Sequence, residues 1–131
     1  MGADKKILLV DDDPDFNMIV RNHLERQGFE VVSAFNGKQG LEKAYADSPD
    51  LIILDVMMDT ATAGFQLALK LHGPDADPAL KDIPILMFSA IHETTPLRFQ
   101  PDGEFLPVDD FLEKPVVPET LLQKVEALLK N

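Results

Sequence analysis

The stretch Ile7-Leu8-Leu9-Val10-Asp11-Asp12 decides the fold class of this chain. A short run of branched apolar residues is typical of a parallel strand that is buried on both faces. The pattern returns in Leu51-Ile52-Ile53-Leu54-Asp55, so a second apolar run also ends on an acid. In open α/β sheets, ligands bind beyond the carboxyl ends of the strands. We therefore expect both sets of acids at one edge of a parallel sheet.

A third stretch adds a positive charge to this edge. The run Asp109-Asp110-Phe111-Leu112-Glu113 ends on Lys114. The carboxylates of Asp11, Asp12 and Asp55 and the ammonium of Lys114 would then lie together. Oxygen ligands neutralise a hard divalent cation, and a lysine offsets the charge of a phosphoryl group. The pattern predicts a site for both.

The rest of the chain alternates between apolar runs and stretches of helical period. Asp13 before Pro14 predicts the cap of the first helix, and Gly28 predicts its end. Such alternation favours a parallel sheet with helices on both faces. Strands are expected over residues 6–10, 30–34, 51–55, 83–89 and 111–112, and helices over residues 14–27, 38–46, 64–71 and 118–130.

One segment interrupts the alternation. A helix is due between Ser89 and Phe111, but Pro96, Pro101 and Pro107 stand too close together for a long one. We predict at most one irregular turn of helix and a mobile surface loop there. The fourth helix of the fold is therefore expected to be irregular or missing.

Composition narrows the class of protein. The chain has 131 residues, 45% of them hydrophobic, which is enough for one compact domain. It has no cysteine, so a thiolate metal site or nucleophile is excluded. No apolar stretch approaches the ~20 residues of a membrane helix, and residues 1–6 lack the apolar segment of a secretory signal. We expect a cytoplasmic protein that does not contact membranes.

The net charge indicates the kind of partner. At pH 7 the formal charge is −11, which repels the phosphate backbone of nucleic acids. Direct binding to DNA or RNA is therefore not expected. A protein partner is expected instead.

Taken in order along the chain, these motifs resemble the receiver domain of two-component response regulators. The resemblance implies a flavodoxin-like, doubly wound sheet of five parallel strands in the order 2-1-3-4-5. The resemblance covers nearly all of residues 1–131. Because the sequence ends at Asn131 after the last helix, we expect a single receiver domain with no output domain. The stretches that carry it are residues 7–14, 51–58, 85–90 and 109–115.

The resemblance also implies a role for each group at the acidic edge. Asp55 is similar to the phosphoacceptor, a carboxylate that attacks the phosphohistidine of a sensor kinase or phosphotransfer protein. Asp11, Asp12 and Asp55 would hold Mg²⁺ together with the backbone carbonyl of Met57. Lys114 would pair with the phosphoryl oxygens and stabilise their charge during transfer.

Two further residues are implicated in the response to phosphorylation. Ser89 stands where the family has a hydroxyl that bonds the new phosphate, and Phe111 occupies the aromatic switch position. The protein would then signal to an unknown downstream protein through a change in its contacts. Apart from assisting its own phosphorylation and dephosphorylation, it is not expected to be an enzyme.

Three alternative functions fit the sequence less well: a scaffold, a phosphatase and a calcium-binding loop. A receiver-like scaffold that works without phosphorylation stays open because of the unusual segment between Ser89 and Phe111. A phosphatase with its nucleophile at the end of the first strand would want a threonine shortly afterwards, which residues 11–16 do not supply. A calcium loop beginning at Asp11 fails, because its sixth position is Phe16 and its twelfth is Asn22.

Overall fold

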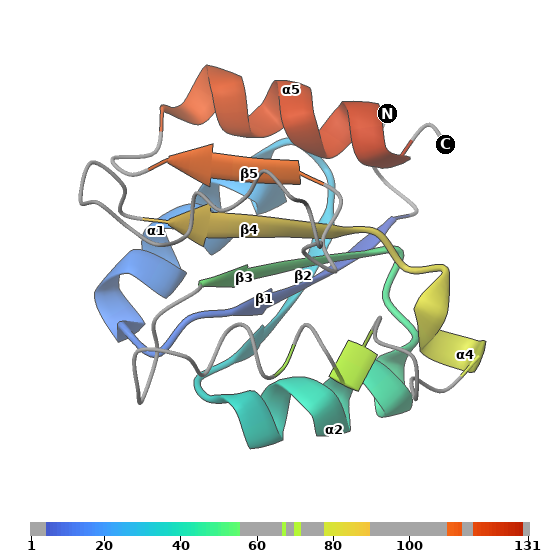
Figure 1. The fold of residues 1–131 in the computed structure, drawn as a ribbon. Helices are drawn as coiled ribbons and strands as arrows, with labels where there is room; N and C mark the ends of the chain where they lie inside the picture. Colours follow the sequence, from blue (N-terminus) through green and yellow to red (C-terminus); the bar gives the residue numbers. More distant parts are fainter. Residues whose placement is uncertain are drawn as a thin grey trace.

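A five-stranded parallel sheet with the strand order β2-β1-β3-β4-β5 runs through the middle of the molecule (Figure 1). This is the order that the family resemblance implied. The computed structural model describes residues 5–55, 67, 70–71, 78–89, 110–113 and 117–129. The strands are β1 (Lys6–Val10), β2 (Glu30–Ala34), β3 (Leu51–Asp55), β4 (Ile85–Ser89) and β5 (Asp110–Glu113).

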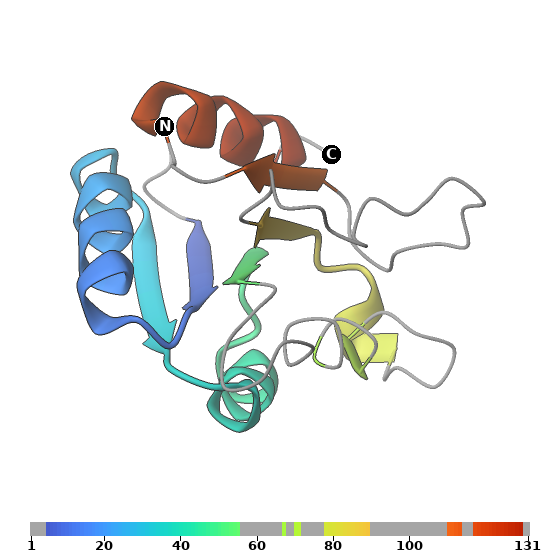
Figure 2. The ribbon, with the colours of Figure 1, turned by 60° about the vertical axis from the view of Figure 1, so that its left-hand side comes forward.

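Helices cover both faces of the sheet. Helices α1 (Pro14–Arg26) and α5 (Pro118–Leu129) lie on one face, and α2 (Gly37–Asp47) and α4 (Pro78–Lys81) lie on the other (Figures 1 and 2). Helix α4 connects β3 to β4, so it is not the helix that was expected to be missing between β4 and β5. That segment, residues 90–109, lies outside the described residues.

Alternate residues of β1, β3 and β4 enter two separate hydrophobic cores. In β1, Ile7 and Leu9 pack in the core beneath α1 and α5, whereas Leu8 and Val10 pack in the core beneath α2. All four are at most 1% exposed. Burial on both faces explains why the strands read as continuous apolar runs instead of alternating ones.

The two ends of α1 follow the predicted signals. Asp13 is the N-cap, and its Oδ1 accepts hydrogen bonds from the backbone amides of Asp15 (3.0 Å) and Phe16 (3.3 Å). Pro14 occupies the first turn, where its missing N–H costs nothing. Gly28 follows the helix with a φ of 95°, a conformation that glycine adopts without steric cost.

The region before β4 differs from the prediction. The strand begins at Ile85 instead of Ile83, because the amide of Ile83 donates to the carbonyl of Leu80 (3.1 Å) and closes the turn after α4. Helix α4 itself was not predicted, since four residues are too short to show a helical period. Strand β5 is longer than predicted, spanning Asp110–Glu113.

Two remaining points concern the helices. Of the helix expected over residues 64–71, the structure describes Leu67, Lys70 and Leu71, and all three are helical. Within the described part of the chain, no helix has both the length and the apolar character needed to cross a membrane.

Candidate metal centre

Three carboxylates meet at the carboxyl edge of the sheet. Asp11 and Asp12 follow β1 directly, and Asp55 is the last residue of β3. Strands β1 and β3 are neighbours, with Val10 level with Leu54, so their carboxyl ends lie side by side. One oxygen atom from each carboxylate lies within 4.8 Å of the others. The sheet thus brings together acids that are separated by more than forty positions in the sequence.

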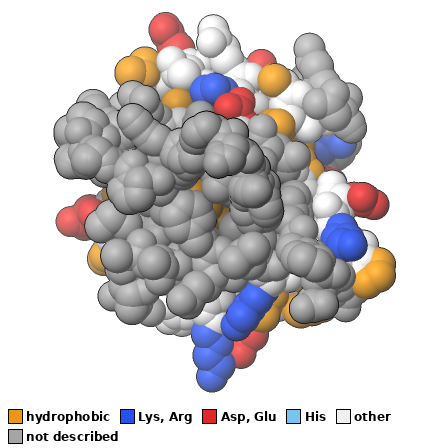
Figure 3. Space-filling model, in the orientation of Figure 1, with side chains coloured by type: hydrophobic (Ala, Val, Ile, Leu, Met, Phe, Trp, Pro, Cys, Tyr) orange, Lys and Arg blue, Asp and Glu red, His pale blue; other side chains and the backbone are white. Residues whose placement is uncertain are grey.

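Burial makes this cluster different from an ordinary acidic surface. Asp11 is 0% exposed and Asp55 is 6% exposed, whereas Asp12 faces the solvent. By contrast, Figure 3 shows other charged side chains of described residues on the surface of the molecule. Removing carboxylates from water and placing like charges together both raise the free energy of the folded state.

A hard divalent cation fits this donor set. Mg²⁺ and Ca²⁺ bind carboxylate oxygens, and Mg²⁺ is typically held by a few of them while it keeps several waters. Asp11 and Asp55 would provide ligands from inside the protein, and Asp12 from the solvent side. The cluster therefore has the chemistry of a metal site that is open on one side.

Backbone hydrogen bonds hold the turn that carries Asp11 and Asp12. The amide of Asp11 donates to the carbonyl of Ala34 (3.1 Å), which continues the pairing of β1 with β2 beyond Val10. The Oδ1 atom of Asp11 accepts from the amide of Asp13 (3.0 Å). Because Asp13 also caps α1, the site and the start of that helix form one unit.

The other predicted site residues are placed only in part. Ser89 is the last residue of β4, one position beyond Phe88, which pairs with Asp55, so its backbone lies at the same edge of the sheet. Phe111 lies in β5, level with Met87. The structure describes the backbone of Ser89 and Phe111 and not their side chains, and Lys114 and Met57 lie outside the described residues.

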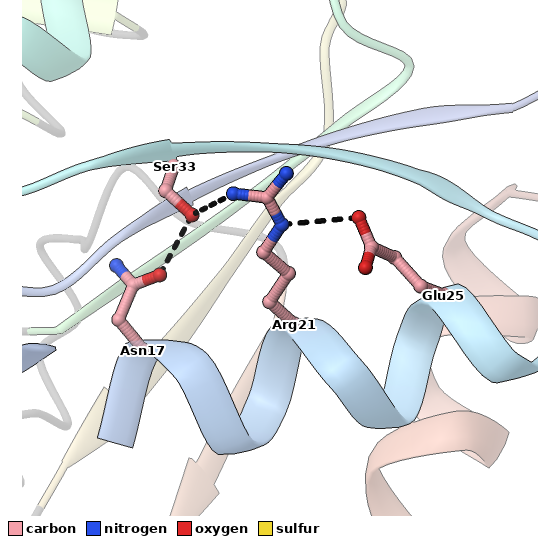
Figure 4. A network of polar contacts seen from close by, with 4 residues as sticks. All are labelled: Asn17, Arg21, Glu25 and Ser33. Atoms are coloured by element: carbon pink, nitrogen blue, oxygen red, sulfur yellow. Dashed lines mark hydrogen bonds and ion pairs between the residues drawn. The ribbon is translucent and has the colours of Figure 1, made fainter. Parts of the chain in front are cut away.

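Sequence reasoning missed a polar network next to the cluster (Figure 4). Asn17 of α1 is 1% exposed and donates through Nδ2 to the backbone carbonyls of Asp11 (3.2 Å) and Ala34 (3.4 Å). A signal was available, because Asn17 stands three positions before Val20 and seven before Leu24, on the buried stripe of the helix. A polar residue in such a stripe needs hydrogen-bond partners inside the protein.

Comparisons with known proteins are consistent with this arrangement. Residues 7–126 match the family model of the response regulator receiver domain. Over 97% of the chain, 34% of residues are identical to the alkaline phosphatase synthesis transcriptional regulatory protein PhoP of Bacillus subtilis. Over 96%, 35% are identical to the DNA-binding dual master transcriptional regulator RpaA of Synechocystis. The chain spans about half the length of these curated relatives, 49% in both cases.

Solved structures show a similar fold. The chemotaxis response regulator CheY4 of Vibrio cholerae superposes with a TM-score of 0.79 at 33% identity, over 95% of this chain and 98% of that one. The receiver domain of the Francisella response regulator 1452 superposes with a TM-score of 0.80 at 27% identity, over 96% of this chain and 97% of that one. The likeness therefore extends over nearly the whole of both structures.

Proposed function

Since this chain belongs to the response regulator receiver domain family, we propose that it accepts a phosphoryl group on Asp55 and signals through a change in its protein contacts. Receiver domains of this family act in two-component signalling, where they interact with sensor kinases or phosphotransfer proteins. The observation that carries the proposal is the cluster in which Asp55 lies within 4.8 Å of Asp11 and Asp12.

The proposed reaction is a transfer from phosphohistidine to a carboxylate. An oxygen of Asp55 attacks phosphorus and forms the new O–P bond, while the P–N bond of the donor breaks. The electron pair of that bond passes to the imidazole nitrogen, which then takes up a proton. Asp55 must be ionised to act as the nucleophile. The residue lies at the end of β3, at the edge of the sheet, and is 6% exposed.

Asp11 and Asp12 serve this step by binding a cation. We assign Mg²⁺ to the site, with Asp11, Asp12, Asp55 and the carbonyl of Met57 as its protein ligands. When bound, the cation supplies positive charge that offsets the oxygens of the phosphoryl group. The near-complete burial of Asp11 keeps one ligand in a fixed position, and the exposure of Asp12 leaves the opposite side accessible.

Three further residues complete the proposal. Lys114 pairs with the phosphoryl oxygens and stabilises the charge of the transition state. The hydroxyl of Ser89 donates to the bound phosphate, and Phe111 moves in response. The position of Ser89 at the end of β4, next to the strand that carries Asp55, supports its part in the proposal. A charge change of about −1.5 to −2 on phosphorylation would then bias the contacts of the protein.

The partner and the location belong to the proposal as well. The phosphoryl donor would be a sensor histidine kinase or a phosphotransfer protein, and the recipient of the signal a downstream protein. One of the curated relatives is described as a DNA-binding regulator, so the prediction that this chain avoids nucleic acid rests on its net charge of −11 alone. A cytoplasmic location and the lack of further enzymatic activity stay predictions from the sequence.

Phosphorylation with a small-molecule donor tests the proposal directly. Incubation with acetyl phosphate and Mg²⁺ is expected to add one phosphoryl group, measured by intact-protein mass spectrometry. Asp55→Asn is expected to remove the adduct, and the matched control Asp47→Asn, an acid at the opposite end of the sheet, is expected to keep it. An adduct that survives in Asp55→Asn, or no adduct in the wild type, would refute the proposed function.

A further inference from the structure

We propose that Asn17 is a positioning residue, which together with Ser33 orients the Asp11–Asp12 peptide for cation binding. The inference rests on the proposed function, because it concerns the cation site that the function requires. It adds residues from α1 and β2 to a site that the acids alone define.

The amide group of Asn17 joins the ends of two strands. Its Nδ2 atom lies 3.2 Å from the carbonyl oxygen of Asp11 and 3.4 Å from that of Ala34, and donates to both. Its Oδ1 atom accepts from the hydroxyl of Ser33 (2.7 Å). The reverse orientation would point Oδ1 at two carbonyl oxygens, so the hydrogen-bond partners determine which way the amide faces.

The bond to Asp11 acts on both acids at once. The carbonyl of Asp11 belongs to the peptide group that links Asp11 to Asp12, and a peptide group is planar. The hydrogen bond from Asn17 to this carbonyl oxygen therefore fixes the orientation of the peptide plane. Because the Cα atoms of Asp11 and Asp12 both lie in that plane, the bond affects the position of both acids. The amide of Asp11 is held in turn by the carbonyl of Ala34 (3.1 Å). The main chain on both sides of Asp11 is thus tied to the end of β2, partly through Asn17.

Ser33 and Arg21 support the Asn17 amide from the other side. Asn17 Oδ1 has no proton, so the Ser33 hydroxyl must be the donor in the bond between them. The oxygen of the same hydroxyl accepts a hydrogen bond from Nη1 of Arg21 (3.4 Å), as Figure 4 shows. Nε of Arg21 donates to Oε2 of Glu25 (3.0 Å). That last pair is over 40% exposed, so its contribution is small. The effect on the site should fall with distance along the network.

Cation affinity of the unphosphorylated protein tests this inference without measuring activity. In an NMR titration with Mg²⁺, Asn17→Leu is expected to weaken binding about tenfold, the lower end of the loss typical for groups that orient metal ligands. Ser33→Ala is expected to weaken binding less than Asn17→Leu does, because it removes only the hydrogen bond that Asn17 Oδ1 accepts. In the Asn17→Leu background, Ser33→Ala should have no further effect, because it acts through Asn17.

A matched control separates positioning from stability. Val20 is 3% exposed on the same stripe of α1, and Val20→Ala is expected to lower the urea midpoint and leave the Mg²⁺ affinity unchanged. If Asn17→Leu and Ser33→Ala also keep the wild-type affinity, or Val20→Ala weakens binding as much as they do, the positioning role is refuted while the proposed function stands. A wild-type protein that binds no Mg²⁺ would refute both.

Discussion

The described residues at the two ends of the sheet differ in how their charges are arranged. At the amino end, opposite charges pair. Nζ of Lys6 lies 3.8 Å from Oδ1 of Asp47 and donates to that residue's carbonyl (3.3 Å), and the Lys6 amide donates to Oδ2 of Asp50 (2.8 Å). These contacts link the start of β1 to the residues just before β3, so they serve the fold.

At the carboxyl end, three of the described residues bring charges of the same sign together. Asp11, Asp12 and Asp55 place an oxygen atom each within 4.8 Å of the others, and two of the three are buried. Repulsion between like charges lowers stability, and a cation that binds there would restore it. The printed contacts at the amino end serve the fold, whereas we propose that the acids at the carboxyl end serve to bind a cation.

The largest effect expected from this comparison is stabilisation by the cation. At a Mg²⁺ concentration about a hundred times the dissociation constant, the free energy of unfolding should rise by about 2.7 kcal/mol. Urea unfolding with and without Mg²⁺ measures the change. NaCl at equal ionic strength is the control, because it screens the acids without coordinating them. An equal gain in NaCl would show that screening alone accounts for the stabilisation.

The second-largest effect is expected from removing one acid of the site, which should lower the Mg²⁺ affinity. Asp12→Ala is expected to reduce the Mg²⁺ affinity at least about tenfold, since even outer-shell changes can cost that much. Asp12 faces the solvent, so the substitution leaves no cavity and should not unfold the protein. An NMR titration measures the affinity. The prediction fails if Asp12→Ala binds as tightly as the matched variant Asp47→Asn.

Asp13 differs from the other acids at the carboxyl end, because its side chain stabilises the fold. Its side chain caps α1, and Asp13→Ala should lower the free energy of unfolding by about 1 kcal/mol. Asp13→Asn keeps the cap and should stay close to the wild type, since asparagine caps helices about as well as aspartate. Chemical denaturation distinguishes them. Equal losses in both variants would mean that the charge, and not the cap, stabilises the helix.

The smallest effect is expected at the amino end. Lys6→Gln removes an ion pair whose partners are 27% and 33% exposed, and should cost no more than about 1 kcal/mol. It should leave the Mg²⁺ affinity unchanged, because Lys6 is the first residue of β1 and Asp11 follows its last residue. Urea unfolding and the Mg²⁺ titration check the two parts. A weaker Mg²⁺ affinity in Lys6→Gln would break the separation between the two ends.

Much of the fold was predictable because its signals are local. The apolar runs of β1 and β3 and the N-cap of α1 were found at their observed positions, since two-sided burial and capping act through neighbouring residues. The start of β4 and the existence of α4 were not. Both depend on the bond between Ile83 and Leu80 and on how a short connection packs, which no periodic pattern reports.

The candidate site divides in the same way. Asp11, Asp12 and Asp55 were expected to meet because each follows an apolar strand. Asn17 and Ser33 were not expected, since a single buried asparagine does not reveal its partner sixteen positions away. The predicted roles of Lys114 and Met57 rest on the resemblance to the family, because both residues lie outside the described part of the chain.

By itself, the sequence determined which segments become strands and that acids stand at the ends of two of them, because strands buried on both faces must be continuously apolar. The order that places β1 between β2 and β3 was already implied by the family resemblance. Only the tertiary structure decided that the three carboxylates lie within 4.8 Å and that the Asn17 amide lies across the ends of β1 and β2. Those distances depend on the packing of α1 against the sheet, to which residues far apart in the chain contribute together.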